Sequence, residues 1–284
     1  MRYLVVVAMI FLSVFLTGFA DAEIPTEIEK VNLKLADDEL AITFLDLSSG
    51  EATLINHVDG GNILINAGGP GTKEELENLL NMYNITNLKS IIITKEDAQY
   101  QSNLDWLIKK YSPSELIIGN LFTEVINSKT IPKVIKWKQT DKHELLPGMK
   151  VEVIQQGISH DGIMGMDLLF EFGSHHILYM TTSNKNVETS LIARKDLSKV
   201  NIIKVADFAR DGGSSQDFIE HIDPQVAIIF QMKGKNPSLD VMERLRETWI
   251  DTYSTKQFGN ITIKCNQNEY DVITISIESS QIVK

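Results

Sequence analysis

The spacing of apolar and polar residues predicts two series of β-strands, each interrupted by helices. Short apolar runs rich in β-branched residues are typical of buried strands. We expect strands at 40–45, 52–57, 62–65, 91–93, 115–118, 134–138, 151–154, 168–172, 176–180, 202–205, 226–230, 251–253, 260–264 and 271–277. Apolar residues three and four apart predict helices that include 76–83, 104–111, 187–193, 216–222 and 239–248. This order favours an α/β fold of the αββα type, a four-layer sandwich in which helices cover two packed sheets.

Three local patterns refine this outline. The string Thr72-Lys73-Glu74-Glu75 matches a capping box at the start of the first helix. The segment from Gly157 to Gly165 is rich in small and polar residues and predicts a surface loop. The chain has three dispersed tryptophans, which favours core or partly buried positions over a stacking platform: Trp106, Trp137 and Trp249.

The N-terminus has the pattern of a secretory signal peptide. Arg2 gives a positive start, Leu4 to Leu16 is almost wholly apolar, and Ala20-Asp21-Ala22 has the form of a cleavage site. An uncleaved membrane anchor stays open as an alternative, because the apolar stretch approaches the length of a membrane span. We therefore expect a signal peptide over 1–22, a polar lead-in over 23–38 and a single domain over 39–284. The mature protein is then secreted or extracytoplasmic, without a membrane segment.

Charge narrows the class of partner. The 284 residues carry a formal net charge of −11, which repels phosphate backbones and anionic lipid surfaces. Nucleic acid is therefore not expected as a ligand, and the partner predicted is an unknown protein or small molecule. Cys265 is the only cysteine, so no intramolecular disulfide is possible.

Several strings resemble the metallo-β-lactamase fold, and within it the hydrolase domain of ComEC-type DNA-uptake competence proteins. Phe44 to Ala52 (F-L-D-L-S-S-G-E-A) is similar to the family opening F-x-D-V-G-Q-G-D-A, and Asn62 to Gly69 is similar to I-L-I-D-G-G. Lys204 to Phe208 falls where K-V-x-H-H-G is expected, and Asn236 to Leu245 falls where H-P-H-P-x-V-L-x-x-L is expected. The resemblance covers the chain from about Leu40 to its end.

The metal ligands of that family are replaced at each matching position. T-K-E-D-A-Q-Y stands at Thr94 to Tyr100, where the family carries T-H-x-H-x-D-H. The resemblance places the old site at seven residues, which we predict to line a vestigial ligand pocket: Lys95, Asp97, Gln99, Tyr100, Thr182, Asp207 and Asn236. Zinc needs imidazole, thiolate or carboxylate ligands, and a charged lysine cannot ligate it. We therefore expect no metal, no cofactor and no catalytic residue.

The resemblance and its exceptions together predict an exported pseudo-hydrolase that is catalytically inactive and binds a ligand or a protein. Two alternatives stay open. One is a phosphodiesterase or nuclease whose site is rebuilt around Asp97 and Asp207, with His160 or Asp211. The other is an accessory role beside a catalytic paralogue.

Lys95 carries a specific physical hypothesis. If Lys95, Asp97 and Asp207 converge as the resemblance implies, the ammonium group replaces the charge of the lost metal and holds both carboxylates. The opposing hypothesis is that Lys95 points from a loop into solvent.

Overall fold

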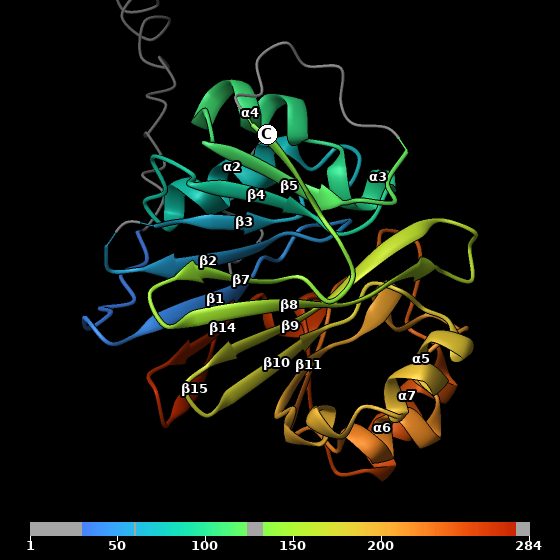
Figure 1. Cartoon of the computed structure of the whole chain (residues 1–284). Helices are drawn as coiled ribbons and strands as arrows, with labels where there is room; N and C mark the ends of the chain where they lie inside the picture. Colours follow the sequence, from blue (N-terminus) through green and yellow to red (C-terminus); the bar gives the residue numbers. More distant parts are fainter. Residues whose placement is uncertain (1–29, 60, 124–132, 277–284) are drawn as a thin grey trace, which may run out of the picture.

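Two sheets pack face to face, with helices on both outer faces, in the four layers that the sequence predicts (Figure 1). The computed structural model describes residues 30–59, 61–123 and 133–276. The predicted signal peptide over 1–22 lies outside these residues, and the single-domain boundary stays a prediction. None of the helices in the described ranges has the length and apolar composition that crossing a bilayer requires.

The first sheet has eight strands in the order β15-β14-β1-β2-β3-β4-β5-β6. Their bounds are β1 Leu40–Phe44, β2 Thr53–His57, β3 Ile63–Ile65, β4 Ser90–Ile93, β5 Glu115–Gly119, β6 Val134–Trp137, β14 Asn260–Cys265 and β15 Tyr270–Ile275. The strands from β3 to β6 are parallel, and the others pair antiparallel. Parallel strands are covered on both faces, which explains why Ile91, Ile92 and Ile93 form an unbroken apolar run.

The second sheet has seven strands in the order β13-β12-β11-β10-β9-β8-β7. Their bounds are β7 Lys142–Leu146, β8 Met149–Ile158, β9 Met164–Phe172, β10 His175–Tyr179, β11 Ile202–Lys204, β12 Val226–Ile229 and β13 Asp251–Ser254. The strands from β10 to β13 are parallel, and β13 ends the sheet.

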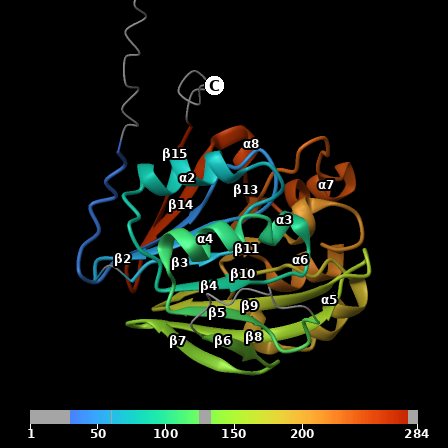
Figure 2. The ribbon, with the colours of Figure 1, turned by 90° about the horizontal axis from the view of Figure 1, so that it is seen from above.

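The longer helices lie on the outer faces because each has one apolar side. Their bounds are α2 Lys73–Met82, α3 Ala98–Gln101, α4 Leu104–Tyr111, α5 Lys185–Ile192, α6 Gln216–Ile222, α7 Leu239–Glu247 and α8 Thr255–Phe258, with 3₁₀ turns η1 Lys195–Lys199 and η2 Ala206–Ala209. Figure 2 shows α2 and α4 lying across the first sheet, and Figure 1 shows α5, α6 and α7 against the second. The buried faces are Leu76, Leu79 and Leu80 in α2, and Leu104, Leu107 and Ile108 in α4.

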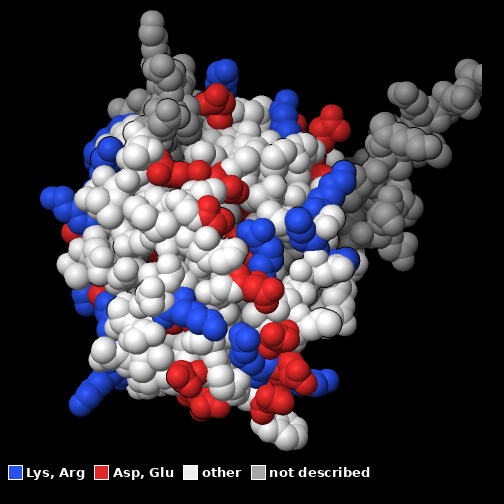
Figure 3. Space-filling model, turned by 90° about the vertical axis from the view of Figure 1, so that its right-hand side faces the viewer, with Lys and Arg blue, Asp and Glu red and all other residues white. Residues whose placement is uncertain are grey.

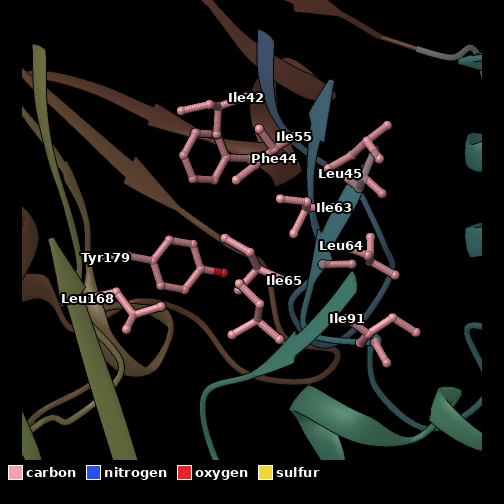
Figure 4. Close-up of a cluster of buried hydrophobic side chains, with 14 of the residues drawn as sticks. Ile42, Phe44, Leu45, Ile55, Ile63, Leu64, Ile65, Ile91, Leu168 and Tyr179 are labelled. Atoms are coloured by element: carbon pink, nitrogen blue, oxygen red, sulfur yellow. The ribbon is translucent and has the colours of Figure 1, made fainter. Parts of the chain in front are cut away.

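The apolar core has two parts. The larger fills the space between the sheets and beneath α2 and α4, and the smaller lies between the second sheet and α5, α6 and α7. Figure 4 shows how Phe44, Ile55 and Ile65 of the first sheet face Leu168 and Tyr179 of the second.

Several local predictions are wrong in instructive ways. Thr72 makes no side-chain cap; its hydroxyl donates to the Gly69 carbonyl at 2.8 Å, because the left-handed glycines at 68 and 71 fold the chain back on itself. The predicted loop from Gly157 to Gly165 is confirmed over 159–163, but its two ends belong to the paired strands β8 and β9. Strand β7 was not predicted, because its sequence K-H-E-L-L has few apolar residues.

Trp249 departs most from its prediction. Trp137 is buried and Trp106 is partly buried, whereas Trp249 is 94% exposed. Dispersion along the sequence therefore does not establish burial.

Phe44 tests the packing between the sheets. It is fully buried, and its ring centroid lies 5.8 Å from that of Phe230, which follows β12 in the other sheet. We expect Phe44→Ala to lower the free energy of unfolding by about 3–5 kcal/mol in urea titrations, because it leaves a cavity. Leu121→Ala, at a residue that is half exposed, is the control and should change it by about 0.5 kcal/mol or less. Equal effects of the two substitutions would contradict this account of the core.

Candidate functional site

The candidate site lies where the carboxyl ends of β4 and β11 meet. Lys95 follows β4 in the first sheet, and Asp207 follows β11 in the second. In α/β sheets, ligands bind beyond the carboxyl ends of strands, so the place is the expected one.

Lys95 occupies the centre of the site. Its residue is fully buried, and its Nζ donates to Asp161 Oδ2 at 2.7 Å and lies 3.5 Å from Asp207 Oδ1. The ammonium also lies 5.5 Å from the centroid of the Tyr100 ring. The hypothesis that Lys95 points into solvent is wrong. Its ammonium instead joins two carboxylates, although the second is Asp161 rather than Asp97.

Asp161 comes from the turn between β8 and β9, a segment that sequence reasoning took for a plain loop. Its Oδ1 accepts from the Ile163 amide at 3.1 Å, so one oxygen shapes the turn while the other binds Lys95. Burial opposes ionisation of this carboxyl, but the hydrogen bond and charge of Lys95 outweigh it and lower the pKa of Asp161.

Asp207 is held by a second cation. Arg210 Nη2 donates to Asp207 Oδ1 at 2.7 Å, so the carboxylate lies between Arg210 and Lys95. Asp207, Phe208 and Ala209 all have left-handed backbone conformations, with φ of 50°, 59° and 56°. Such conformations cost roughly 1–3 kcal/mol for residues with a side chain, and they occur where surrounding contacts hold the chain in place. This strained turn aims Asp207 inward.

A second ion pair lies deeper in the same place. Lys204 Nζ contacts Glu51 Oε2 at 2.5 Å, and both side chains are fully buried. Lys204 also lies 4.5 Å from the centroid of the Tyr179 ring, whose negative face favours a cation. Burial raises the pKa of Glu51 and lowers the pKa of Lys204, while their mutual attraction opposes both shifts. The pair joins the two sheets, since Glu51 precedes β2 and Lys204 ends β11.

Two of the predicted residues, Asp97 and Gln99, accept hydrogen bonds from a backbone amide and from a serine hydroxyl, respectively. Asp97 is the N-cap of α3, and its Oδ1 accepts from the Gln99 amide at 2.8 Å. Gln99 Oε1 accepts from the Ser49 hydroxyl at 2.7 Å. Within the described ranges, Asp97 is not among the acidic groups paired with Lys95. Asp97 therefore stabilises the start of α3.

Aromatic rings fill the space between these groups. The ring centroids of Tyr100 and Phe208 lie 5.9 Å apart, and both residues are buried.

A cavity bordered by Phe208 and Asn236 has a volume of about 10 Å³, which is room for about one water molecule. Asn236 itself is exposed, and its Oδ1 accepts from Lys256 at 3.2 Å. That the seven residues line a ligand pocket stays a prediction.

Thr182 lies beside a carboxylate that sequence reasoning missed. Asp167 of β9 is fully buried, and its Oδ1 accepts from the amides of Thr181 at 2.6 Å and Thr182 at 2.8 Å. Burial raises the pKa of Asp167 to about 6, which outweighs these hydrogen bonds. Asp167 stands in the apolar strand sequence M-D-L-L-F, whose other residues give no sign of a polar site. Only the fold could therefore reveal this buried carboxylate.

The donor set does not fit the metal that this arrangement of sheets suggests. Lys95 and Arg210 neutralise Asp161 and Asp207, and no three His, Cys, Asp or Glu side chains of the described residues are grouped to hold a metal ion. A metal would have to displace two cations that are already hydrogen-bonded to these carboxylates.

Solved structures share the fold of this chain. The chain is similar to YhfI of Bacillus subtilis, a metallo-β-lactamase fold protein, with a TM-score of 0.58, 11% identity, and coverage of 80% of this chain and all of that one. The chain has the metallo-β-lactamase fold.

A putative metal-dependent hydrolase from Parabacteroides distasonis matches with a TM-score of 0.53 and 14% identity, over 76% of this chain and 92% of that one. Zinc-bound PqqB from Methylobacterium extorquens matches with a TM-score of 0.53 and 9% identity, over 79% and 99%. No protein-family model matches the chain, and no curated protein matches it in sequence. Identities this low establish the fold alone.

The buried pair of Lys204 and Glu51 gives a double-mutant test. We expect Lys204→Met to lower the free energy of unfolding by about 3–5 kcal/mol, because it leaves Glu51 buried without its partner. Adding Glu51→Gln should recover part of that loss, since the uncompensated charge is then removed. Lys133→Met is the control: Lys133 pairs with Glu115 at an exposed position, and its loss should cost about 1 kcal/mol or less. Strictly additive single effects in urea titrations would contradict the coupling.

Asp167 gives a test of pH dependence. Its folded pKa of about 6 exceeds the ordinary value of 3.8, so the folded protein binds more protons between these values, and stability falls as the pH rises through this window. This contribution changes the free energy of unfolding by up to about 1.4 kcal/mol per pH unit, and we expect Asp167→Asn to remove it. In urea unfolding from pH 4 to 7, the free energy of unfolding of the variant should therefore rise relative to that of the native chain as the pH rises. An identical pH profile for both proteins would contradict the assignment.

Proposed function

We propose that the chain is an exported, catalytically inactive member of the ComEC-like group within the metallo-β-lactamase fold, and that it acts by binding a protein or small molecule. The observation that carries this proposal is the position of Lys95, whose ammonium lies between Asp161 and Asp207.

Charge explains why this arrangement opposes catalysis. Hydrolases that use zinc depend on the metal to lower the pKa of a bound water molecule. Here the two carboxylates nearest the centre are paired with Lys95 and Arg210, which repel a divalent cation. The charge that a metal would supply is already present, but an ammonium group cannot activate water as a Lewis acid.

The ComEC-like assignment rests on the framework strings rather than on the site. Glu51 and Lys204 belong to two of the strings that carry the resemblance, and they contact each other in the interior. Export rests on the signal pattern of residues 1–22.

The partner is proposed to be a protein or a small molecule rather than nucleic acid. The net charge is −11, and basic and acidic side chains are interspersed on the face shown in Figure 3. A surface of this kind does not attract a phosphate backbone.

The alternative hydrolase with a site rebuilt around Asp97 and Asp207 gains no support from the geometry. Asp97 caps α3, and Asp207 is bound by Arg210. An acid–base pair would need both carboxylates to face a common substrate.

Metal content and activity test the proposal together. We expect protein purified without chelator to contain far less than one equivalent of zinc or manganese and to show no hydrolysis of bis(p-nitrophenyl) phosphate. We also expect the thermal unfolding midpoint to stay unchanged by EDTA, because no metal contributes to stability.

An active metallo-β-lactamase-fold phosphodiesterase, assayed in the same buffers, is the positive control. Near-stoichiometric zinc or manganese, together with phosphodiesterase activity that EDTA abolishes, would overturn the proposal.

A further inference from the structure

A groove on the outer face of the molecule combines two unusually exposed apolar side chains. Trp249 is 94% exposed and Leu239 is 84% exposed, and both border a groove of about 590 Å³ between α7 and β13. Figure 2 shows these two elements side by side. We call this surface the α7–β13 groove. It lies on the second sheet's outer edge and includes none of the residues of the Lys95 site.

Trp249 is held outward by the backbone. Its φ is 59°, a left-handed conformation that bulky residues rarely adopt, and its amide donates to the Arg246 carbonyl at 3.2 Å. Met242 and Ile250 line the groove beside it. One surface therefore carries both a protruding aromatic ring and an apolar recess, and tryptophan in such a setting is a frequent anchor of protein interfaces.

The groove also borders an unpaired strand edge. β13 ends its sheet, and its only strand partner in the described ranges is β12. Asp251 N donates to the Gln225 carbonyl at 3.0 Å, so Asp251 and Tyr253 direct their backbone groups toward β12. Alternate residues of a strand face opposite neighbours, so Thr252 and Ser254 direct theirs outward. Such an edge is a template for another strand.

The groove carries charged side chains of both signs, so the groove of one copy can complement the groove of another. Glu243 and Asp251 are acidic, whereas Arg246 is basic, and all three line the groove. Arg246 Nη2 lies 3.4 Å from Glu243 Oε1 of its own chain, but the Arg246 side chain is 77% exposed and stays accessible to an acidic group on a second molecule. A two-fold arrangement places Arg246 of one copy against the acidic groups of the other, twice.

We propose that the α7–β13 groove is a self-association surface whose occupant is a second copy of this chain. Trp249 of each copy enters the groove of the other, and the two β13 edges pair antiparallel about a two-fold axis. In an isologous interface the same patch is used on both copies, so the patch must be complementary to itself. The α7–β13 groove has this property, because it carries a protruding ring, an apolar recess, a strand edge and charges of both signs. The proposal is independent of the function proposed above.

Sedimentation velocity of the protein isolated from its host, over a wide concentration range, tests the proposal. We expect a reversible monomer–dimer equilibrium. Trp249→Ala and Leu239→Glu should each weaken the dimer at least tenfold, because they remove the apolar contact. Ile158→Ala is the control: it removes a similarly exposed apolar side chain, 54% exposed at the end of β8, and should leave the equilibrium unchanged.

Hydrogen exchange locates the contact. The amides of Thr252 and Ser254 should exchange more slowly as the dimer forms, and the slowing should be lost in Trp249→Ala. Unchanged circular dichroism would show that this variant is folded. A monomer at every concentration would overturn the proposal, even if the groove captured another protein. A dimer insensitive to both substitutions would overturn it equally.

Discussion

The buried contact of Lys204 with Glu51 is the constraint around which the two sheets are arranged. It joins the end of β11 to the segment before β2, so it fixes the relative position of the sheets at the edge where the candidate site lies. A buried ion pair contributes little to net stability, but losing one partner is costly, because the remaining charge has no solvent. The aromatic ring of Tyr179 adds a favourable surface for the ammonium group. The geometry of the site therefore depends on keeping both partners.

Lys95 is stabilised in the same way, by carboxylates and an aromatic ring. Its ammonium pairs with Asp161 and Asp207 and lies over the ring of Tyr100, which packs against Phe208. A metal centre stabilises converging carboxylates with a divalent charge, and here Lys95 and Arg210 supply positive charge from the chain itself. The site thus keeps its internal electrostatic balance without a Lewis acid.

The sequence was a good guide to the elements and to part of the site. Strand and helix positions followed from apolar spacing, since burial on one or both faces imposes that spacing directly. The pairing of Lys95 with Asp207 could be hypothesised because both stand in strings that resemble a known framework. The pairing with Asp161 could not, because Asp161 lies in a turn outside the strings that carry the resemblance. The hypothesised pairing of Asp97 with Lys95 was wrong for a related reason: a carboxylate before a helix can serve as a ligand or as an N-cap, and only the backbone geometry decides between them.

By itself, the sequence determined the layered fold and showed that no histidine stands in T-K-E-D-A-Q-Y at Thr94 to Tyr100, because periodicity and residue type are local properties of the chain. The tertiary structure alone decided which charges meet. It brought Asp161 to Lys95, set Arg210 on Asp207, buried Asp167 within an apolar strand, and left Trp249 exposed beside a strand edge. The physical reason is that ion pairing and exposure depend on distances between segments remote in sequence. Those distances are fixed only when the two sheets pack.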